Sequence, residues 1–170
     1  MLGIKAAFDR FMKLILVAVF LSLAITQSRG DDLADAKAAF ATLQEYQKTD
    51  DIRSPDLFAT NCTVTLAVTD GMNRRTLVVP DGKFRVMLTN AIARKEGNSD
   101  VCEDAIYTQE GSSVRMSCTV LFADSGKRGP LTLLYARDSD GKLRIKEMKI
   151  TKPVEKLTAD EAPENPSKEP

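Results

Sequence analysis

The segment from Ser113 to Ile150 constrains the fold more than any other part of the chain. Hydrophobic side chains recur at every second residue of its first part, which is the period of a β-strand: Val114, Met116, Cys118, Val120 and Phe122. Turn sequences rich in Gly, Asp and Ser separate this run from two further strand-like runs, 131–137 and 142–150. With residues 101–108 before them, these runs predict a four-stranded antiparallel meander with one apolar face to cover.

The last of these strands changes phase along its length. Leu143 and Ile145 share one face, whereas Met148 and Ile150 fall on the other. A β-bulge near Lys146–Glu147 would bring all four to the same side, because an inserted residue re-aims the strand that follows it.

The residues before the meander predict helices and one hairpin. A helical stripe at the start consists of Leu33, Ala36, Phe40, Leu43 and Gln47. Ser54 and Pro55 favour a short helix over Pro55–Ala59. Residues 62–69 and 75–79 read as a β-hairpin, and residues 81–97 as a further helix, with Phe84 and Leu88 in its apolar stripe.

The N-terminus predicts export. An apolar run of about 12 residues follows Lys13, which fits the core of a signal peptide and is short of the roughly 20 residues that span a bilayer. We expect cleavage between Thr26 and Gly30, and a periplasmic or secreted mature protein. The alternative is an uncleaved anchor, the one case in which we expect a membrane contact. Either Met1 or Met12 could be the residue at which translation starts.

The expected domain is 31–152, followed by a disordered Pro-rich tail at 153–170. Without residues 1–30 the chain has 20 basic and 23 acidic side chains, so charge gives no reason to expect a nucleic-acid partner. It has no histidine, no Cys-x-x-Cys spacing and no glycine-rich phosphate loop. We therefore expect no metal and no cofactor.

The order of elements resembles the nuclear transport factor 2-like superfamily, which includes the ketosteroid isomerase and scytalone dehydratase relatives. The resemblance covers about Leu33 to Lys152. It is carried by "SPDLFATNCTVTL", "VVPDGKFRVMLTNAI" and "LTLLYARDSDGKLRIKEMKI". The alternative is an unrelated α+β meander. The resemblance implies a cone-shaped α+β fold, in which a strongly bent, mainly antiparallel sheet of about six strands surrounds about three helices. It also implies a pocket at the mouth of the cone and a homodimer surface on the outer face of the sheet.

The resemblance suggests residues for the pocket. In the isomerase branch a tyrosine of the first helix donates to a developing oxyanion, and Tyr46 occupies such a place. Asp104 shares a phase with Cys102 and Ile106, so it is either an acid inside the cone or a carboxylate in water. The family's carboxylate base in the first strand is missing between Asn61 and Val68, which puts isomerase chemistry in doubt. The expected ligand-binding residues are Tyr46, Phe84, Leu88, Asp104, Met116 and Val120.

Three functions follow from this interpretation. The first is an exported protein that binds a small apolar ligand or a partner without turnover. The second is an exported isomerase or dehydratase using Tyr46 and Asp104. The third is a structural dimer module.

The cysteines predict one disulfide. If Gln109-Glu110-Gly111 closes the first meander hairpin, Thr108 pairs with Ser112 and Cys102 lies opposite Cys118. Export makes oxidation of this pair the expected state. Cys62 is then left either buried or available for pairing between chains.

Two surface features remain. Lys142, Arg144 and Lys146 form a basic stripe that is either solvated or receives an anionic partner. Asn61-Cys62-Thr63 fits a glycosylation sequon in a eukaryotic source.

Overall fold

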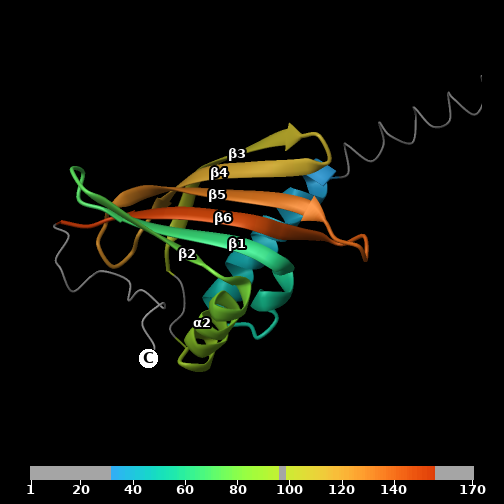
Figure 1. The fold of residues 1–170 in the computed structure, drawn as a ribbon, viewed down its shortest axis with the longest axis horizontal. Coiled ribbons are helices and arrows are strands. Elements are labelled where there is room, and N and C mark those ends of the chain that lie inside the picture. The colour runs from blue at the N-terminus through green and yellow to red at the C-terminus, as the bar shows by residue number, and fades with distance from the viewer. Residues whose placement is uncertain (1–31, 96–98, 156–170) are drawn as a thin grey trace, which may run out of the picture.

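The computed structural model describes residues 32–95 and 99–155 (Figure 1). The expected signal peptide and most of the expected tail lie outside these residues. Within the described part, a helix covers residues 32–49 and is followed by one turn of 3-10 helix, η1 (Ser54–Leu57). The remaining elements are β1 (Phe58–Thr69), β2 (Arg74–Val79), α2 (Asp81–Ala93), β3 (Val101–Glu110), β4 (Ser113–Leu121), β5 (Arg128–Arg137) and β6 (Leu143–Pro153).

The strands form one mixed six-stranded sheet in the order β2-β1-β6-β5-β4-β3. All neighbouring strands are antiparallel except β1 and β6, which run parallel. The expected α+β class, hairpin and meander are confirmed. The expected helix at Pro55–Ala59 is wrong, because only a 3-10 turn forms there. Phe58 and Ala59 already belong to β1, where both side chains are buried.

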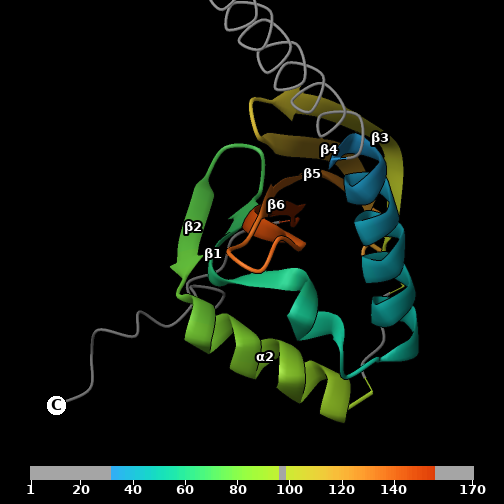
Figure 2. The ribbon, with the colours of Figure 1, turned by 90° about the vertical axis from the view of Figure 1, so that its right-hand side faces the viewer.

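The N-terminal helix and α2 lie on the same side of the sheet (Figure 2). The apolar face of β4 points toward them, because its buried Met116 and Val120 belong to one core with Phe40 of the N-terminal helix and Phe84 of α2. Phe84 of α2 packs edge-on against Phe58, with ring centroids 4.9 Å apart. Ala36, Phe40 and Leu43 of the predicted helical stripe are buried in the same core.

One arginine fixes the start of the N-terminal helix to the end of β5. The guanidinium of Arg137 donates to Asp32 Oδ1 at 2.8 Å and to Asp35 Oδ2 at 2.7 Å. Asp32 is buried, so this charge needs its partner. The helix therefore crosses the sheet from the Arg137 end toward the end where β6 finishes (Figure 1).

The predicted bulge in the last strand is confirmed. Leu134 pairs with Glu147, but Tyr135 pairs with Ile145, so Lys146 is the inserted residue. Ile145 is buried, and Met148 and Ile150 pack against the same core.

A second bulge, in β3, was not predicted. The β3–β4 register shifts between Glu103 and Ile106, and Asp104 has a φ of +54°. Asp is among the few residues besides Gly that adopt this left-handed conformation readily. Beyond the bulge, Tyr107 turns toward the core and Ile106 turns outward, with 67% of its surface exposed.

The last strand extends past residue 152, where the domain was expected to end. β6 runs to Pro153, and the Val154 N–H donates to the Thr69 carbonyl at 2.8 Å. Across residues 32–95 and 99–155, no helix is both long and apolar enough to cross a membrane.

Candidate functional site

A cavity of about 260 Å³ lies between the N-terminal helix and the sheet. The helix contributes residues at positions i, i+3, i+4 and i+7, which lie on one face of a helix. These are Phe40, Leu43, Gln44 and Gln47. The sheet contributes hydrophobic side chains from four strands: Leu66 of β1, Val120 of β4, Leu131 and Leu133 of β5, and Met148 and Ile150 of β6.

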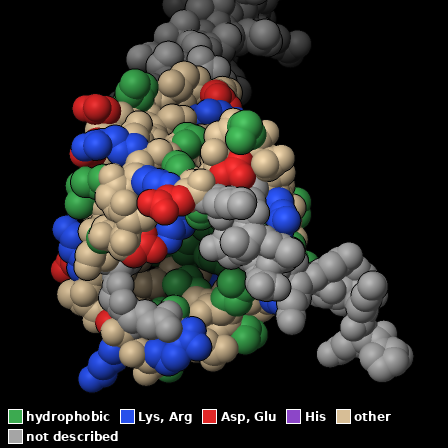
Figure 3. Space-filling view, turned by 90° about the vertical axis from the view of Figure 1, so that its left-hand side faces the viewer, with side chains coloured by type: hydrophobic (Ala, Val, Ile, Leu, Met, Phe, Trp, Pro, Cys, Tyr) green, Lys and Arg blue, Asp and Glu red, His purple; other side chains and the backbone are tan. Residues whose placement is uncertain are grey.

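The strand register brings these sheet residues together. Ile150 pairs with Leu66 on one side and with Leu131 on the other, so the three form a continuous row across the sheet. Met148 and Leu133 form part of the next row. The surface is hollowed at the end of the molecule shown in Figure 3, with hydrophobic side chains in its depth.

Two further residues line the cavity beside β3. Asp100 precedes the strand directly, and Cys102 is its second residue. One carboxylate oxygen of Asp100 accepts a hydrogen bond of 2.9 Å from the Ala123 N–H. Among the described lining residues, Asp100 is the only charged one, and Gln44 and Gln47 supply the side-chain amides.

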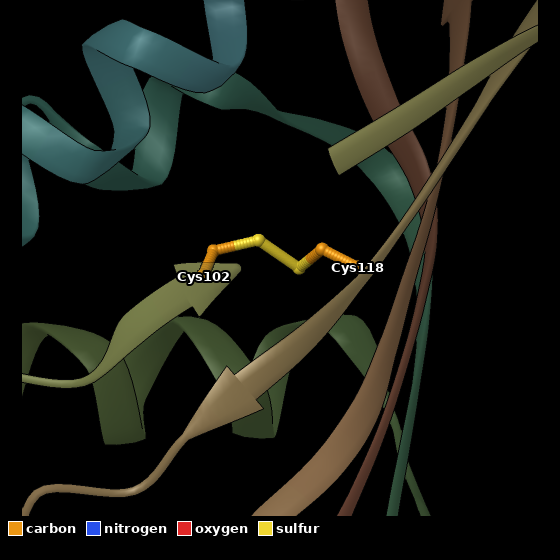
Figure 4. The surroundings of a disulfide bond; sticks show 2 residues. All are labelled: Cys102 and Cys118. Carbon is orange, nitrogen blue, oxygen red and sulfur yellow. A yellow bond between two sulfur atoms is a disulfide. The ribbon is translucent and has the colours of Figure 1, made fainter. Parts of the chain in front are cut away.

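The predicted disulfide is present, and it forms part of this wall. Cys102 and Cys118 are joined, with Cα atoms 6.0 Å apart (Figure 4). The predicted register is wrong, because Cys102 pairs with Val120 and Thr108 with Arg115. The hairpin closes through Gly111 and Ser112 after Glu110 pairs with Ser113. Gly111, with a φ of +60°, takes the first position of this two-residue loop.

Of the six expected ligand-binding residues, only Val120 lines the cavity. Met116 is fully buried in the core, Phe84 packs on Phe58, and Leu88 is half-buried on α2. Met116, Phe84 and Leu88 therefore contribute to core packing and do not line the cavity.

The two residues that the enzyme alternative would use, Tyr46 and Asp104, do not lie in the cavity. Arg53 lies over the Tyr46 ring, 4.7 Å from its centroid, and Tyr46 is not a lining residue. Asp104 is exposed at the β3 bulge, which agrees with the alternative of a carboxylate in water and not with an acid inside the cone. The bulge is the physical reason, since it ends the phase that Asp104 shared with Cys102.

Sequence reasoning missed most of the lining, although one signal was available. Gln47 falls on the apolar stripe of the first helix. A polar side chain that faces a core needs a hydrogen-bond partner or water, so its presence there indicates a cavity and not close apolar packing. Asp100 had no such signal, because it lies in a connection without periodicity.

A larger and more open cleft, about 850 Å³, lies near η1 and the β5–β6 turn. Its arginines are engaged within the protein. Arg85 donates to Asp81 and to the carbonyls of Pro55, Phe58 and Ala59. Two residues of the predicted basic stripe are likewise paired with acids: Arg144 bonds Asp138 and Asp140, and Lys146 bonds Asp138. The third, Lys142, directly precedes β6. We therefore take the apolar cavity as the candidate site.

No family model matches the sequence, and no curated protein matches it. The fold does match solved structures. One is a candidate dehydratase of the NTF2-like family from Streptomyces avermitilis, with a TM-score of 0.51 and 14% identity over 72% of this chain and 96% of that one. The chain has the nuclear transport factor 2-like fold.

Two other structures with this fold have no assigned function. An NTF2-like protein from Pseudomonas putida has a TM-score of 0.52 and 10% identity, covering 70% of this chain and 84% of its own. A protein from Pectobacterium atrosepticum, from a family of unknown function, has a TM-score of 0.51 and 16% identity, covering 71% and 90%. At such identities the nuclear transport factor 2-like fold is shared, while the chemistry of each site has to be argued from its own residues.

Within the described residues, no cluster of three or more His, Cys, Asp or Glu side chains is arranged to hold a metal ion. The described residues that line the cavity supply it with one carboxylate, two side-chain amides and apolar walls.

Proposed function

We propose that this chain is an exported protein that binds a small, mainly apolar molecule in the cavity between its N-terminal helix and its sheet, without turnover. The observation that carries the proposal is the composition of the cavity wall, which is hydrophobic except for Gln44, Gln47 and Asp100. Ligand sites of proteins have this character, with apolar walls and a few polar groups that fix orientation.

The size of the cavity limits the ligand. An apolar cavity of about 150 Å³ accommodates benzene, so 260 Å³ suits a molecule of roughly ten non-hydrogen atoms. A ligand of this size would be enclosed between Phe40 and Leu43 on the helix side and the Leu131 row on the sheet side.

The same wall supports the proposal that the protein does not turn its ligand over. General acid–base catalysis of the isomerase type combines a proton-transferring group with an oxyanion donor, and each contributes typically about 10²–10⁴-fold. Asp100 offers the first function, but no tyrosine is among the described lining residues. The chain also has no histidine to take either role.

Blocking the cavity tests the proposal. Leu131→Trp places a large ring in the cavity, whereas Thr132→Trp places the same ring on the opposite face of β5. The measurement is calorimetric titration of each variant with propylbenzene and 2-phenylethanol, with circular dichroism to verify folding. We expect Leu131→Trp to weaken binding at least about tenfold, and Thr132→Trp to leave it unchanged. Equal binding by both variants would show that the molecules bind elsewhere.

A parallel assay measures turnover. The purified protein is incubated with cyclic enone and hydroxy-ketone substrates of about ten non-hydrogen atoms, the size that the cavity suits, and product is followed by chromatography. We expect none above background. Turnover that disappears in Asp100→Asn would instead establish the isomerase or dehydratase alternative.

Export is the second part of the proposal. It is supported by the apolar run after Lys13 and by the oxidised pair Cys102–Cys118, which fits an oxidising compartment. N-terminal sequencing of the protein recovered outside the cytoplasm should show cleavage of the chain between Thr26 and Gly30. An intact N-terminus on a membrane-bound protein would favour the anchor.

The homodimer through the outer face of the sheet stays a prediction. That face carries ion pairs, including Arg115 with Glu110 and Glu147 with Lys149. Sedimentation of the protein alone tests it.

A further inference from the structure

We infer that the molecule held in the cavity carries a neutral polar end that both donates and accepts hydrogen bonds, such as a carboxamide, and that Gln44 and Gln47 bind this end. This inference rests on the proposed function and names the class of ligand. It is carried by two side-chain amides that line the cavity and have no partner among the described residues.

The first observation is the placement of the two amides. Gln44 and Gln47 lie three positions apart on the N-terminal helix, and both line the cavity. Residues with this spacing are neighbours on a helix surface, with Cβ atoms about 5–6 Å apart. One polar group of a ligand can therefore reach both side chains at once.

The second observation is that both amides are unpaired. No hydrogen bond joins either side chain to another described residue, and both residues are half-buried. The hydroxyls of Thr42 and Thr49, on the same helix, each donate to a backbone carbonyl one turn earlier at 2.9 Å. The two glutamines therefore keep their full set of donors and acceptors for a ligand or for water, whereas each threonine hydroxyl uses its donor within the helix.

The chemistry of the glutamine side chain defines the polar end of the ligand. Each side-chain amide offers two N–H donors and a carbonyl oxygen that accepts. A ligand carboxamide matches such a pair, because its N–H donates to one glutamine oxygen while its carbonyl accepts from the nitrogen of the other. A ketone can only accept, so it leaves one half of this exchange unmade.

The two amides carry no charge, and this favours a neutral ligand end. An ion held by two neutral amides beside apolar walls gives up its hydration without a full counter-charge, which costs more than the transfer of a neutral amide. The body of the ligand contacts the hydrophobic part of the wall, which includes Phe40, Leu43 and the Leu131 row. The cavity therefore suits a small amphipathic molecule with an apolar body and an amide-like end.

Four probes of one shape separate the ligand classes: benzamide, acetophenone, benzoate and benzamidine. They share a planar ring and differ at one end, which is a carboxamide, a ketone, an anion and a cation, respectively. Each is close to the roughly ten non-hydrogen atoms that the cavity suits. Calorimetric titration of the mature protein at neutral pH gives the affinities, with propylbenzene as the apolar reference. We expect benzamide to bind about threefold to tenfold more tightly than acetophenone, and about tenfold or more tightly than either ion.

Replacing both glutamines by methionine, Gln44→Met with Gln47→Met, removes the amides and keeps side chains of similar length and helix propensity. We expect this variant to lose the preference for benzamide over acetophenone and to bind propylbenzene at least as tightly as before. Each single variant should lose part of the preference, so the test does not depend on the folding of the double variant. Lys48→Met is the matched control, because it places the same side chain on the same helix at an exposed position outside the cavity. It should leave all affinities unchanged.

The outcomes distinguish the inference from the proposed function. Equal binding of benzamide and acetophenone, tighter binding of either ion than of benzamide, or a benzamide preference that survives the double substitution would overturn the inference and leave the binding function in place. Failure of every probe to bind, propylbenzene included, would overturn the binding function itself.

Discussion

Cys102 and Cys118 are joined by a disulfide although they are not opposite each other, since Cys102 pairs in register with Val120. The bond therefore runs diagonally across β3 and β4. It ties down the part of β3 that precedes the Asp104 bulge, and this part carries Cys102 in the wall of the cavity.

Replacing both cysteines by serine should lower the free energy of unfolding by about 3 kcal/mol, because the bond closes a loop of 16 residues in the unfolded chain. Ligand binding should weaken as well, since the wall beside Asp100 loses its anchor. Urea unfolding with and without reductant measures the first effect. Reductant should destabilise the native protein and leave the double variant unchanged. An unchanged midpoint for the native protein would contradict the prediction.

Gly129 is required by the close approach of β5 to β6. A Cβ atom there would lie 2.0 Å from the Thr151 carbonyl oxygen, which is backbone and cannot move aside. We expect Gly129→Ala to cost about 1–3 kcal/mol or more, as overpacked cores do. Gly82→Ala in α2 is the control, because a Cβ there meets nothing within 4 Å. Thermal unfolding should show a loss for the first variant only.

Tyr135 has a buried hydroxyl that meets no hydrogen-bond partner among the described residues, and burial raises its pKa. Tyr135→Phe removes an unsatisfied polar group, so we expect it to stabilise the protein by about 1 kcal/mol. Above about pH 10 the unfolded chain loses the hydroxyl proton of Tyr135, whereas the folded protein still holds it. The native protein should therefore lose stability as the pH rises above about 10.

Denaturant unfolding near neutral pH and above about pH 10 measures both effects of Tyr135→Phe, and the alkaline loss should be smaller in this variant. Tyr107→Phe should remove less of it, because Tyr107 is only half-buried. A destabilised Tyr135→Phe protein would show that the hydroxyl has a partner in solution.

Cys62 should be chemically inert in the folded protein. Burial raises the pKa of its thiol to about 11, with Asp81 contributing in the same direction, so only about one part in a thousand is thiolate near pH 8. Iodoacetamide should label Cys62 only after unfolding, as peptide mass mapping would show. The stability gained by burying the neutral thiol should be kept below about pH 9 and lost as the pH approaches 11. Rapid labelling of the folded protein would contradict this account.

Sequence periodicity predicted one bulge and missed the other for a physical reason. Near Lys146 the hydrophobic residues on either side change phase, so the insertion is visible in the pattern. At Asp104 the pattern misleads, because Ile106 keeps the phase of Cys102 but lies exposed on the outer face of the edge strand. An edge strand is packed on fewer sides than a central strand, so an exposed hydrophobic residue on it costs little. Its hydrophobic pattern is therefore a weaker guide to which face is buried.

The candidate site was less predictable than the fold. The stripe of the first helix indicated that Phe40, Leu43 and Gln47 face the sheet, and the structure places all three at the cavity. It could not indicate which apolar positions remain uncovered. Met116 and Phe84 belong to the same inner face as Val120, but close packing fills the space around them.

The parallel pairing of β1 with β6 also has a kinetic consequence. Within the sheet it is the one ladder that joins the hairpin to the meander, and it pairs residues about 80 positions apart, such as Val64 and Met148. Contacts so distant in sequence carry a larger loop-closure cost than the short connections within the meander. We therefore expect β4, β5 and β6 to acquire amide protection first during refolding and β1 to dock onto β6 last, an order that pulse-labelled hydrogen exchange resolves.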